Sequence, residues 1–249
     1  MDNLNANVGG EAVVVSNMGF FQKIAGVIFS PGKTMRSIAE RPKILFPLLL
    51  AAFSQVIVYL VRYPLYQDFM AETLKKSMEI QKTKFNIELT PQQVDQALQI
   101  QSISSLVATP IMTLLVWLIG TAVVYGLLKA FKGQGKFKSY LAVTGYAYII
   151  TLLYQLIVIA VSFFTGSLYL MVPLTSLASL LPADMAGTFL FGVIKGIDLF
   201  SIWFYAVIAI GLAEASKVKK TTVYTIVGIV FALVLLIAGA GEMAQGMYM

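Results

Sequence analysis

Long apolar runs alternate with short polar segments along this chain, and each run is close to the length that crosses a lipid bilayer. Two of the runs occupy residues 103–128 and 139–164, and the others lie at residues 44–61, 197–213 and 221–240. A helix rises ~1.5 Å per residue, so roughly 17–25 apolar residues cross the ~30 Å hydrocarbon core. The pattern therefore predicts an all-α, polytopic membrane protein with five transmembrane helices across residues 44–249.

Before the first span, a polar stretch at residues 1–18 predicts a mobile cytosolic tail, and residues 19–43 become amphipathic. On a helical wheel the apolar side chains of the first part gather within about 120°, opposite Gln22, Lys23 and Gly26. About ten residues cannot span a bilayer, so we expect this segment to lie in the membrane interface. Its membrane-facing side chains are Phe20, Phe21, Ile24, Val27 and Ile28.

Local signals predict further helices outside the spans. Ser30 followed by Pro31 marks the start of a short helix that ends before Pro42. Residues 65–102 form a polar insert with mixed charges, in which Thr90 and the proline after it start a helix leading into the second span. We interpret the insert as an external helical hairpin. Residues 167–182 are apolar but too short for a span, which favours a re-entrant or interfacial segment.

Charge predicts the orientation. The chain has 249 residues, of which 58% are hydrophobic and 12% charged, and its net charge is +6. Twelve of its 18 Lys and Arg residues fall before residue 44 or in the loops after the second and fourth spans. Cytoplasmic loops are enriched in Lys and Arg, so the N-terminus should be cytoplasmic and the C-terminus external. The cations therefore indicate topology and not a nucleic-acid surface.

Several chemistries are excluded by composition. The chain contains no Cys and no His, which removes disulfides, Cys/His metal sites and His-dependent nucleophilic catalysis. The sequence Gly32-Lys33-Thr34 lacks the first glycine of a phosphate-binding loop, because Val27 stands there. Ser30 and Lys33 lack the companion motifs of serine–lysine enzymes. We therefore expect no enzyme activity, no cofactor and no metal.

A stripe of polar residues on the third span is the first candidate site, because its members lie within roughly 80° of one another. A second group on the fourth span lies within about 60°, so the two could line a polar seam. Interhelical hydrogen bonding without a site is the alternative. Asp198 could also pair with Lys195, three residues before it, near the outer boundary. The candidate seam is Tyr140, Thr144, Tyr148, Thr151, Gln155, Asp198, Ser201 and Tyr205.

Small residues form one face of the fifth span. Such faces allow membrane helices to approach closely, within one chain or between a chain and a partner. The candidate packing or partner face is Thr221, Thr225, Gly228, Ala232 and Gly239.

Several short motifs between Ser30 and about Gly228 resemble the Yip family, multi-spanning membrane proteins named for binding Ypt/Rab GTPases. Their order matches the bacterial branch of that family. They are Ser30-Pro31-Gly32-Lys33-Thr34, Arg41-Pro42, Pro47, Trp117, Gly120, Tyr125, Gly133-Gln134-Gly135-Lys136-Phe137, Gly145-Tyr146-Ala147, Asp198, Trp203 and Gly211-Leu212. The resemblance implies five spans and a cytosolic N-terminus. Eukaryotic members act in vesicle transport, usually in hetero-oligomers, and some bacterial members are encoded beside ATP-binding-cassette exporters. The Asp-Leu-Tyr-Gly-Pro motif of the eukaryotic members is absent from this chain.

These observations predict a non-enzymatic membrane adaptor or scaffold in membrane trafficking or in support of a transport complex. A small transporter or channel subunit, or an accessory subunit of an ATP-binding-cassette exporter, is the alternative. Expected partners are the lipid bilayer and either another membrane protein or further copies of this chain, with no nucleic acid. In a bacterium the protein should reside in the plasma (inner) membrane.

Overall fold

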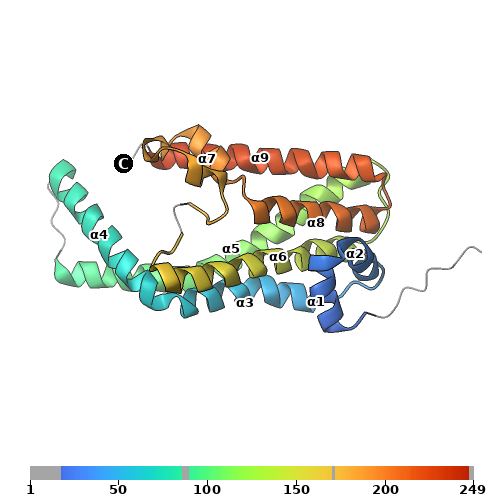
Figure 1. The fold of residues 1–249 in the computed structure, drawn as a ribbon, viewed down its shortest axis with the longest axis horizontal. Helices are drawn as coiled ribbons and strands as arrows, with labels where there is room; N and C mark the ends of the chain where they lie inside the picture. Colours follow the sequence, from blue (N-terminus) through green and yellow to red (C-terminus); the bar gives the residue numbers. More distant parts are fainter. Residues whose placement is uncertain (1–17, 86–89, 170–171, 247–249) are drawn as a thin grey trace, which may run out of the picture.

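The computed structural model describes residues 18–85, 90–169 and 172–246, and it is a bundle of long helices (Figure 1). Within these residues there is no β-strand, and one isolated bridge joins Ser176 to Asp198. The elements are α1 (Phe20–Phe29), α2 (Pro31–Glu40), α3 (Leu45–Val61), α4 (Tyr63–Phe85), α5 (Pro91–Ala130), α6 (Phe137–Thr165), η1 (Leu177–Leu180), η2 (Ala183–Met185), α7 (Phe189–Lys195), α8 (Leu199–Ser216) and α9 (Lys220–Gly246).

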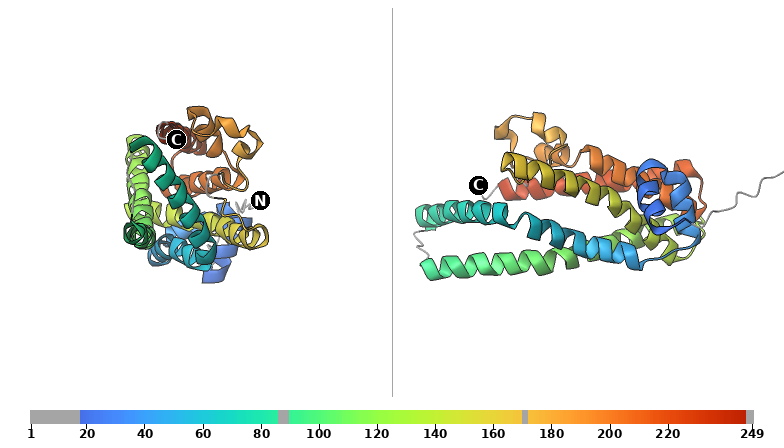
Figure 2. Two further views of the ribbon diagram at one scale, coloured as in Figure 1. Left: turned by 90° about the vertical axis from the view of Figure 1, so that its left-hand side faces the viewer. Right: turned by 60° about the horizontal axis from the view of Figure 1, so that its bottom comes forward.

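The helices that run along the length of the bundle are the candidate membrane spans. Among the described residues α5, α6, α8 and α9 are long and apolar enough to cross a bilayer, and a fifth span is counted if α2 and α3 are taken as one, bent by 119°. α3 alone has 17 residues and packs along α5 and α6. Two views confirm that these helices run side by side (Figure 2). The prediction of an all-α, polytopic membrane protein is confirmed.

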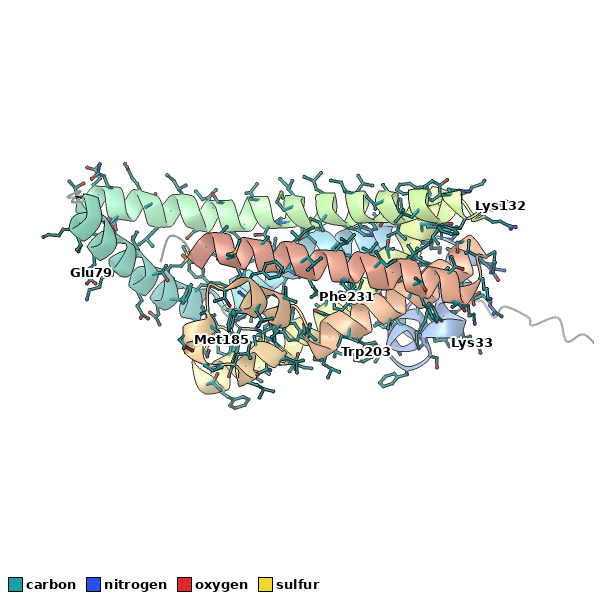
Figure 3. The ribbon with its side chains drawn as sticks, turned by 90° about the horizontal axis from the view of Figure 1, so that it is seen from above. Lys33, Glu79, Lys132, Met185, Trp203 and Phe231 are labelled. Atoms are coloured by element: carbon teal, nitrogen blue, oxygen red, sulfur yellow. The ribbon has the colours of Figure 1, made fainter. Side chains whose placement is uncertain are left out.

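The two ends of the bundle differ in what they carry. The turns after α5 and α8 lie at the same end as α1 and α2, which we call the basic end. Figure 3 shows Lys33 and Lys132 there, and Glu79 of α4 at the opposite end, which we call the α4 end. The last turn of α9 also lies at the α4 end (Figure 1). α1 and the end of α9 thus lie at opposite ends, as five crossings require. The side of the membrane each end faces stays a prediction.

The main core is at the basic end, where α2 lies across α6 and α8. Met35 and Ile38 of α2, Leu128 of α5, Tyr140 of α6 and Leu212 of α8 are all but inaccessible to solvent and belong to one cluster. Gly211 makes this crossing possible, because a Cβ there would lie 2.8 Å from Val143 Cβ and 3.1 Å from Met35 Sδ.

The rotation of α1 differs from the prediction. Lys23 and Gly26 of the expected polar face are buried in the protein, whereas Phe21 is 80% exposed, as a membrane-facing side chain should be. Val27 is buried, Ile24 and Ile28 are half-buried against the core, and Phe20 is half-exposed. The reason is that Gly26 lacks a side chain and so lets Thr34 of α2 come into contact. The part of the predicted interface that stays open is Phe20, Phe21 and, beyond the prediction, Phe29.

At the other end, α4 and the first turns of α5 form the expected hairpin (Figure 2). The backbone N–H of Gln93 donates to Thr90 Oγ1 at 3.4 Å, which caps α5 as its sequence predicts. In the described part of residues 167–188 the chain forms 3₁₀ turns and no α-helix, consistent with a segment that does not span. Along its membrane-length part α5 exposes large apolar side chains such as Ile111, Val116 and Ile119, as a lipid-facing helix does.

Candidate functional site

The predicted polar seam is divided among several places in the structure. Tyr140 is fully buried at the basic end and its hydroxyl donates to the Gln134 carbonyl at 2.9 Å. Thr144 and Tyr148 lie one and two turns further along α6, and Thr151 and Gln155 follow, half-buried, toward the α4 end. Each of these side chains therefore has different surroundings, and the stripe is not one continuous site.

Thr144 is the centre of a buried hydrogen-bond cluster between α5 and α6. The indole Nε1 of Trp117 donates to Thr144 Oγ1 at 3.0 Å, and Thr121 Oγ1 lies 2.8 Å from the same atom. Thr144 Oγ1 is also 2.9 Å from the Tyr140 carbonyl, to which it donates. Sequence reasoning missed Thr121. The available signal was its position one helical turn after Trp117, a residue whose N–H needs an acceptor when buried.

A cavity of 160 Å³ adjoins this cluster between α5, α6, α8 and α9. It brings together Thr144, Tyr148 and Tyr205 of the predicted seam, with the Tyr148 and Phe204 rings edge to face. The rest of its lining is apolar apart from Thr121, and none of its lining residues is charged. The cavity suits an apolar group and does not provide a path for an ion.

Asp198 lies at the start of α8 and caps it. Its carboxylate accepts from the Phe200 N–H at 2.8 Å, from Ser201 Oγ at 2.5 Å and from Thr175 Oγ1 at 2.9 Å. Asp198 therefore lies at the end of the span, which agrees with its predicted position near the boundary of the fourth span. Three donors satisfy the carboxylate, so its geometry is that of a helix cap.

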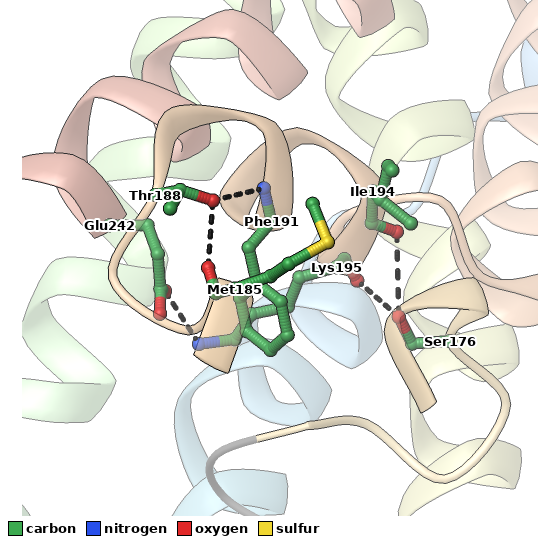
Figure 4. Close-up of polar contacts among 7 residues, drawn as sticks. All are labelled: Ser176, Met185, Thr188, Phe191, Ile194, Lys195 and Glu242. Atoms are coloured by element: carbon green, nitrogen blue, oxygen red, sulfur yellow. Dashed lines mark hydrogen bonds and ion pairs between the residues drawn. The ribbon is translucent and has the colours of Figure 1, made fainter. Parts of the chain in front are cut away.

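The expected pairing of Lys195 with Asp198 does not form. Lys195 Nζ instead lies 2.9 Å from Glu242 Oε2 of α9, and Ser176 Oγ donates to the Lys195 carbonyl (Figure 4). Glu242 was not considered at the sequence level, because it follows the predicted end of the fifth span. The contact ties α7 to α9 at the α4 end.

A second ion pair ties α2 to α8 at the basic end. Arg36 donates to Glu214 through Nε at 3.0 Å and through a second nitrogen at 3.4 Å, and Lys217 Nζ lies 3.6 Å from the same carboxylate. The Glu214 carboxylate, through its hydrogen bond and its charge, raises the pKa of the Arg36 guanidinium above its usual value. This ion pair could not be predicted from the sequence, because Arg36 and Glu214 are 178 residues apart in the chain.

The predicted small-residue face of α9 has two parts. At Gly239 it is covered by α7, because a Cβ there would lie 2.7 Å from Val193 and 2.8 Å from the Phe189 carbonyl. Thr221, Thr225, Gly228 and Ala232 are exposed, and a Cβ on Gly228 would have no atom of the described residues within 4 Å. The prediction allowed either packing within the chain or contact with a partner. The face packs against α7 at Gly239, and contact with a partner at Gly228 stays a prediction.

No group of three acidic, His or Cys side chains lies close enough to hold a metal ion in the described part of the chain.

The family model of the Yip1 domain matches residues 25–241. Membrane protein YknW of Bacillus subtilis (strain 168) is 28% identical over 195 residues, which cover 78% of this chain and 79% of that protein. No solved structure matches the chain.

Proposed function

This chain belongs to the Yip1 domain family and is an integral, multi-pass membrane protein, and we propose that it works as a non-enzymatic adaptor that binds a partner membrane protein. The observation that carries the proposal is the uncovered part of the α9 face, from Thr221 to Ala232. The same face accepts a helix, α7, where it passes Gly239. Where α7 ends, the face remains suited to a second helix, supplied by a partner.

Small residues matter in this setting because lipid tails give membrane helices no hydrophobic reason to associate. Association depends on close packing, which small residues allow, and on weak interhelical hydrogen bonds, which Thr can form. Four such residues recur on one face of α9 over three turns. Because no described residue lies within 4 Å of a Cβ added at Gly228, a larger side chain there should disturb a partner and not the fold.

A Gly228→Leu substitution tests the proposal. It should abolish complementation of a deletion strain and reduce the recovery of the partner, while the melting temperature of the purified protein changes little. Gly241→Leu is the matched control, since Gly241 is also open but lies about 140° around the helix. The proposal is wrong if both variants complement equally well.

The second candidate, a small transporter, draws on the cavity beside Thr144, Tyr148 and Tyr205. A coupled transporter usually needs an Asp, Glu, Lys, Arg or His side chain where its substrate is held, and this lining has none of these. Asp198 is the one acidic residue in the predicted polar seam, so it is the candidate for this coupling group. Asp198→Asn should complement, because an amide oxygen still caps α8. Loss of function at normal expression, together with a harmless Gly228→Leu, would favour the transporter.

A further inference from the structure

A second cavity, at the α4 end, differs from the one described above because its lining is both cationic and apolar. It has a volume of 400 Å³ and lies between the end of α3, the first turns of α4, α6 and the described part of residues 168–173. Arg62, Tyr59 and Gln155 supply polar groups to it, and Phe69, Met70 and Pro173 supply apolar ones. Arg62 is the residue directly after α3.

The Arg62 guanidinium is buried without a negative partner. The residue is 3% exposed, and in the described part of the chain no carboxylate forms an ion pair with it. One of its terminal nitrogens donates to the Leu168 carbonyl, and the Tyr66 ring centroid is 5.5 Å from its Cζ atom. Its Nε has no acceptor among the described residues. A buried charge is costly unless it is paired, so this arrangement lacks an anion.

A second unsatisfied group lines the same cavity. The hydroxyl of Tyr59 is buried and has no hydrogen-bond partner in the part of the chain that the structure describes. Buried hydroxyl and guanidinium groups are nearly always satisfied in folded proteins. Two donors without acceptors in one cavity therefore call for a ligand with several anionic oxygens. Phosphate fits best, because the guanidinium fork binds its oxygens in pairs.

The position of the cavity indicates where the phosphate comes from. The end of α3 is where the hydrocarbon core gives way to lipid headgroups. Acidic side chains line the two neighbouring cavities, Asp68 and Glu72 in one and Asp68 and Asp95 in the other, and these repel a free anion arriving from water. A lipid arrives within the membrane and places its chains on Phe69 and Met70. We propose that this cavity binds the phosphate of an anionic phospholipid through Arg62 and Tyr59.

Native mass spectrometry of the delipidated full-length protein tests this. The probes are phosphatidylglycerol, a diacylglycerol with the same acyl chains, and inorganic phosphate. Phosphatidylglycerol should bind the protein as one tight equivalent, and the other two should neither bind at comparable concentration nor displace it. Arg62→Gln should weaken that binding roughly 10- to 100-fold, the range for a hydrogen bond to a charged group.

Tyr59→Phe separates binding from folding. Its hydroxyl makes no hydrogen bond to the described residues, so the variant should fold normally and bind phosphatidylglycerol about 5-fold more weakly. The matched controls are Lys75→Gln and Tyr63→Phe, which change exposed side chains on α4 and should bind as the parent does. The site is refuted if Arg62→Gln and Tyr59→Phe bind like the controls. Binding of inorganic phosphate that displaces the lipid would refute the lipid as its source.

Discussion

At the basic end the carboxylate of Glu214 meets a guanidinium and an ammonium, whereas at the α4 end the guanidinium of Arg62 meets a backbone carbonyl and no carboxylate among the described residues. The two ends are built from similar helices and both bury a charge. At the basic end the chain neutralises that charge itself. At the α4 end the Lys195–Glu242 pair is neutral, but the charge of Arg62 has no anionic partner among the described residues, so the packing around Arg62 should depend on its surroundings for stability.

The basic end is also more closely packed than the α4 end. The main buried cluster joins α2, α5, α6 and α8 at the basic end, and Gly211 lies where α8 contacts α2 and α6. The cavities of 400, 560 and 680 Å³ all lie at the α4 end, around the start of α4. A closely packed end is suited to holding the spans in register, and an end with cavities is suited to accepting a ligand.

The largest effect should come from overpacking the basic end. In Gly211→Leu the new side chain enters the space held by Val143 and Met35, at a cost of about 3 kcal/mol, and α2 should separate from α8. Thermal unfolding in detergent measures the loss. Gly241→Leu, on an open part of α9, is the control and should be neutral. Equal melting temperatures for both variants would contradict the packing difference.

A smaller effect is expected from the ion pairs. Glu214→Gln weakens the attachment of α2 and should lower the melting temperature by roughly 2–4 °C, with faster tryptic cleavage after Arg36. Glu242→Gln breaks the corresponding pair with Lys195 at the α4 end and should leave cleavage at Arg36 unchanged. If both variants increase tryptic cleavage after Arg36 equally, the two ends of the bundle are coupled. The ion pairs then do not act separately at each end.

The smallest effect concerns Lys23 of α1. Burial, followed by the nearby charges of Lys43 and Arg41, lowers the pKa of the Lys23 ammonium. The unfolded state therefore binds more protons between the lowered pKa and the usual value of about 10.4, so stability should rise with pH across that window. Lys23→Met should remove this rise and stabilise the protein at pH 7 by at most about 0.5 kcal/mol, since solvent screens the charges. Melting temperatures from pH 7 to pH 10 check both statements, and a parent protein that loses stability over this range would contradict them.

The sequence was sufficient for the fold class and for the starts of several helices. Span length follows from the number of consecutive apolar residues, which is a local property and needs no knowledge of neighbours. The cap of α5 at Thr90 involves residues three apart and is equally local. The proline after Ser30 placed the start of α2 for the same reason, although Ser30 makes no side-chain hydrogen bond there.

The tertiary structure decided which face of each helix packs against the other helices and which groups the buried charges contact. The rotation of α1 depends on Thr34 packing at Gly26, and the division of the polar stripe depends on where α5 and α8 cross α6. The partners of Arg36, Lys195 and Arg62 lie far away in the chain, at Glu214, Glu242 and the Leu168 carbonyl. A side chain bonds whatever group folding brings within about 3 Å of it, and no spacing in the sequence encodes that distance. Helix length is therefore fixed by the chain itself, and the surroundings of each buried charge are fixed by the packing of the helices.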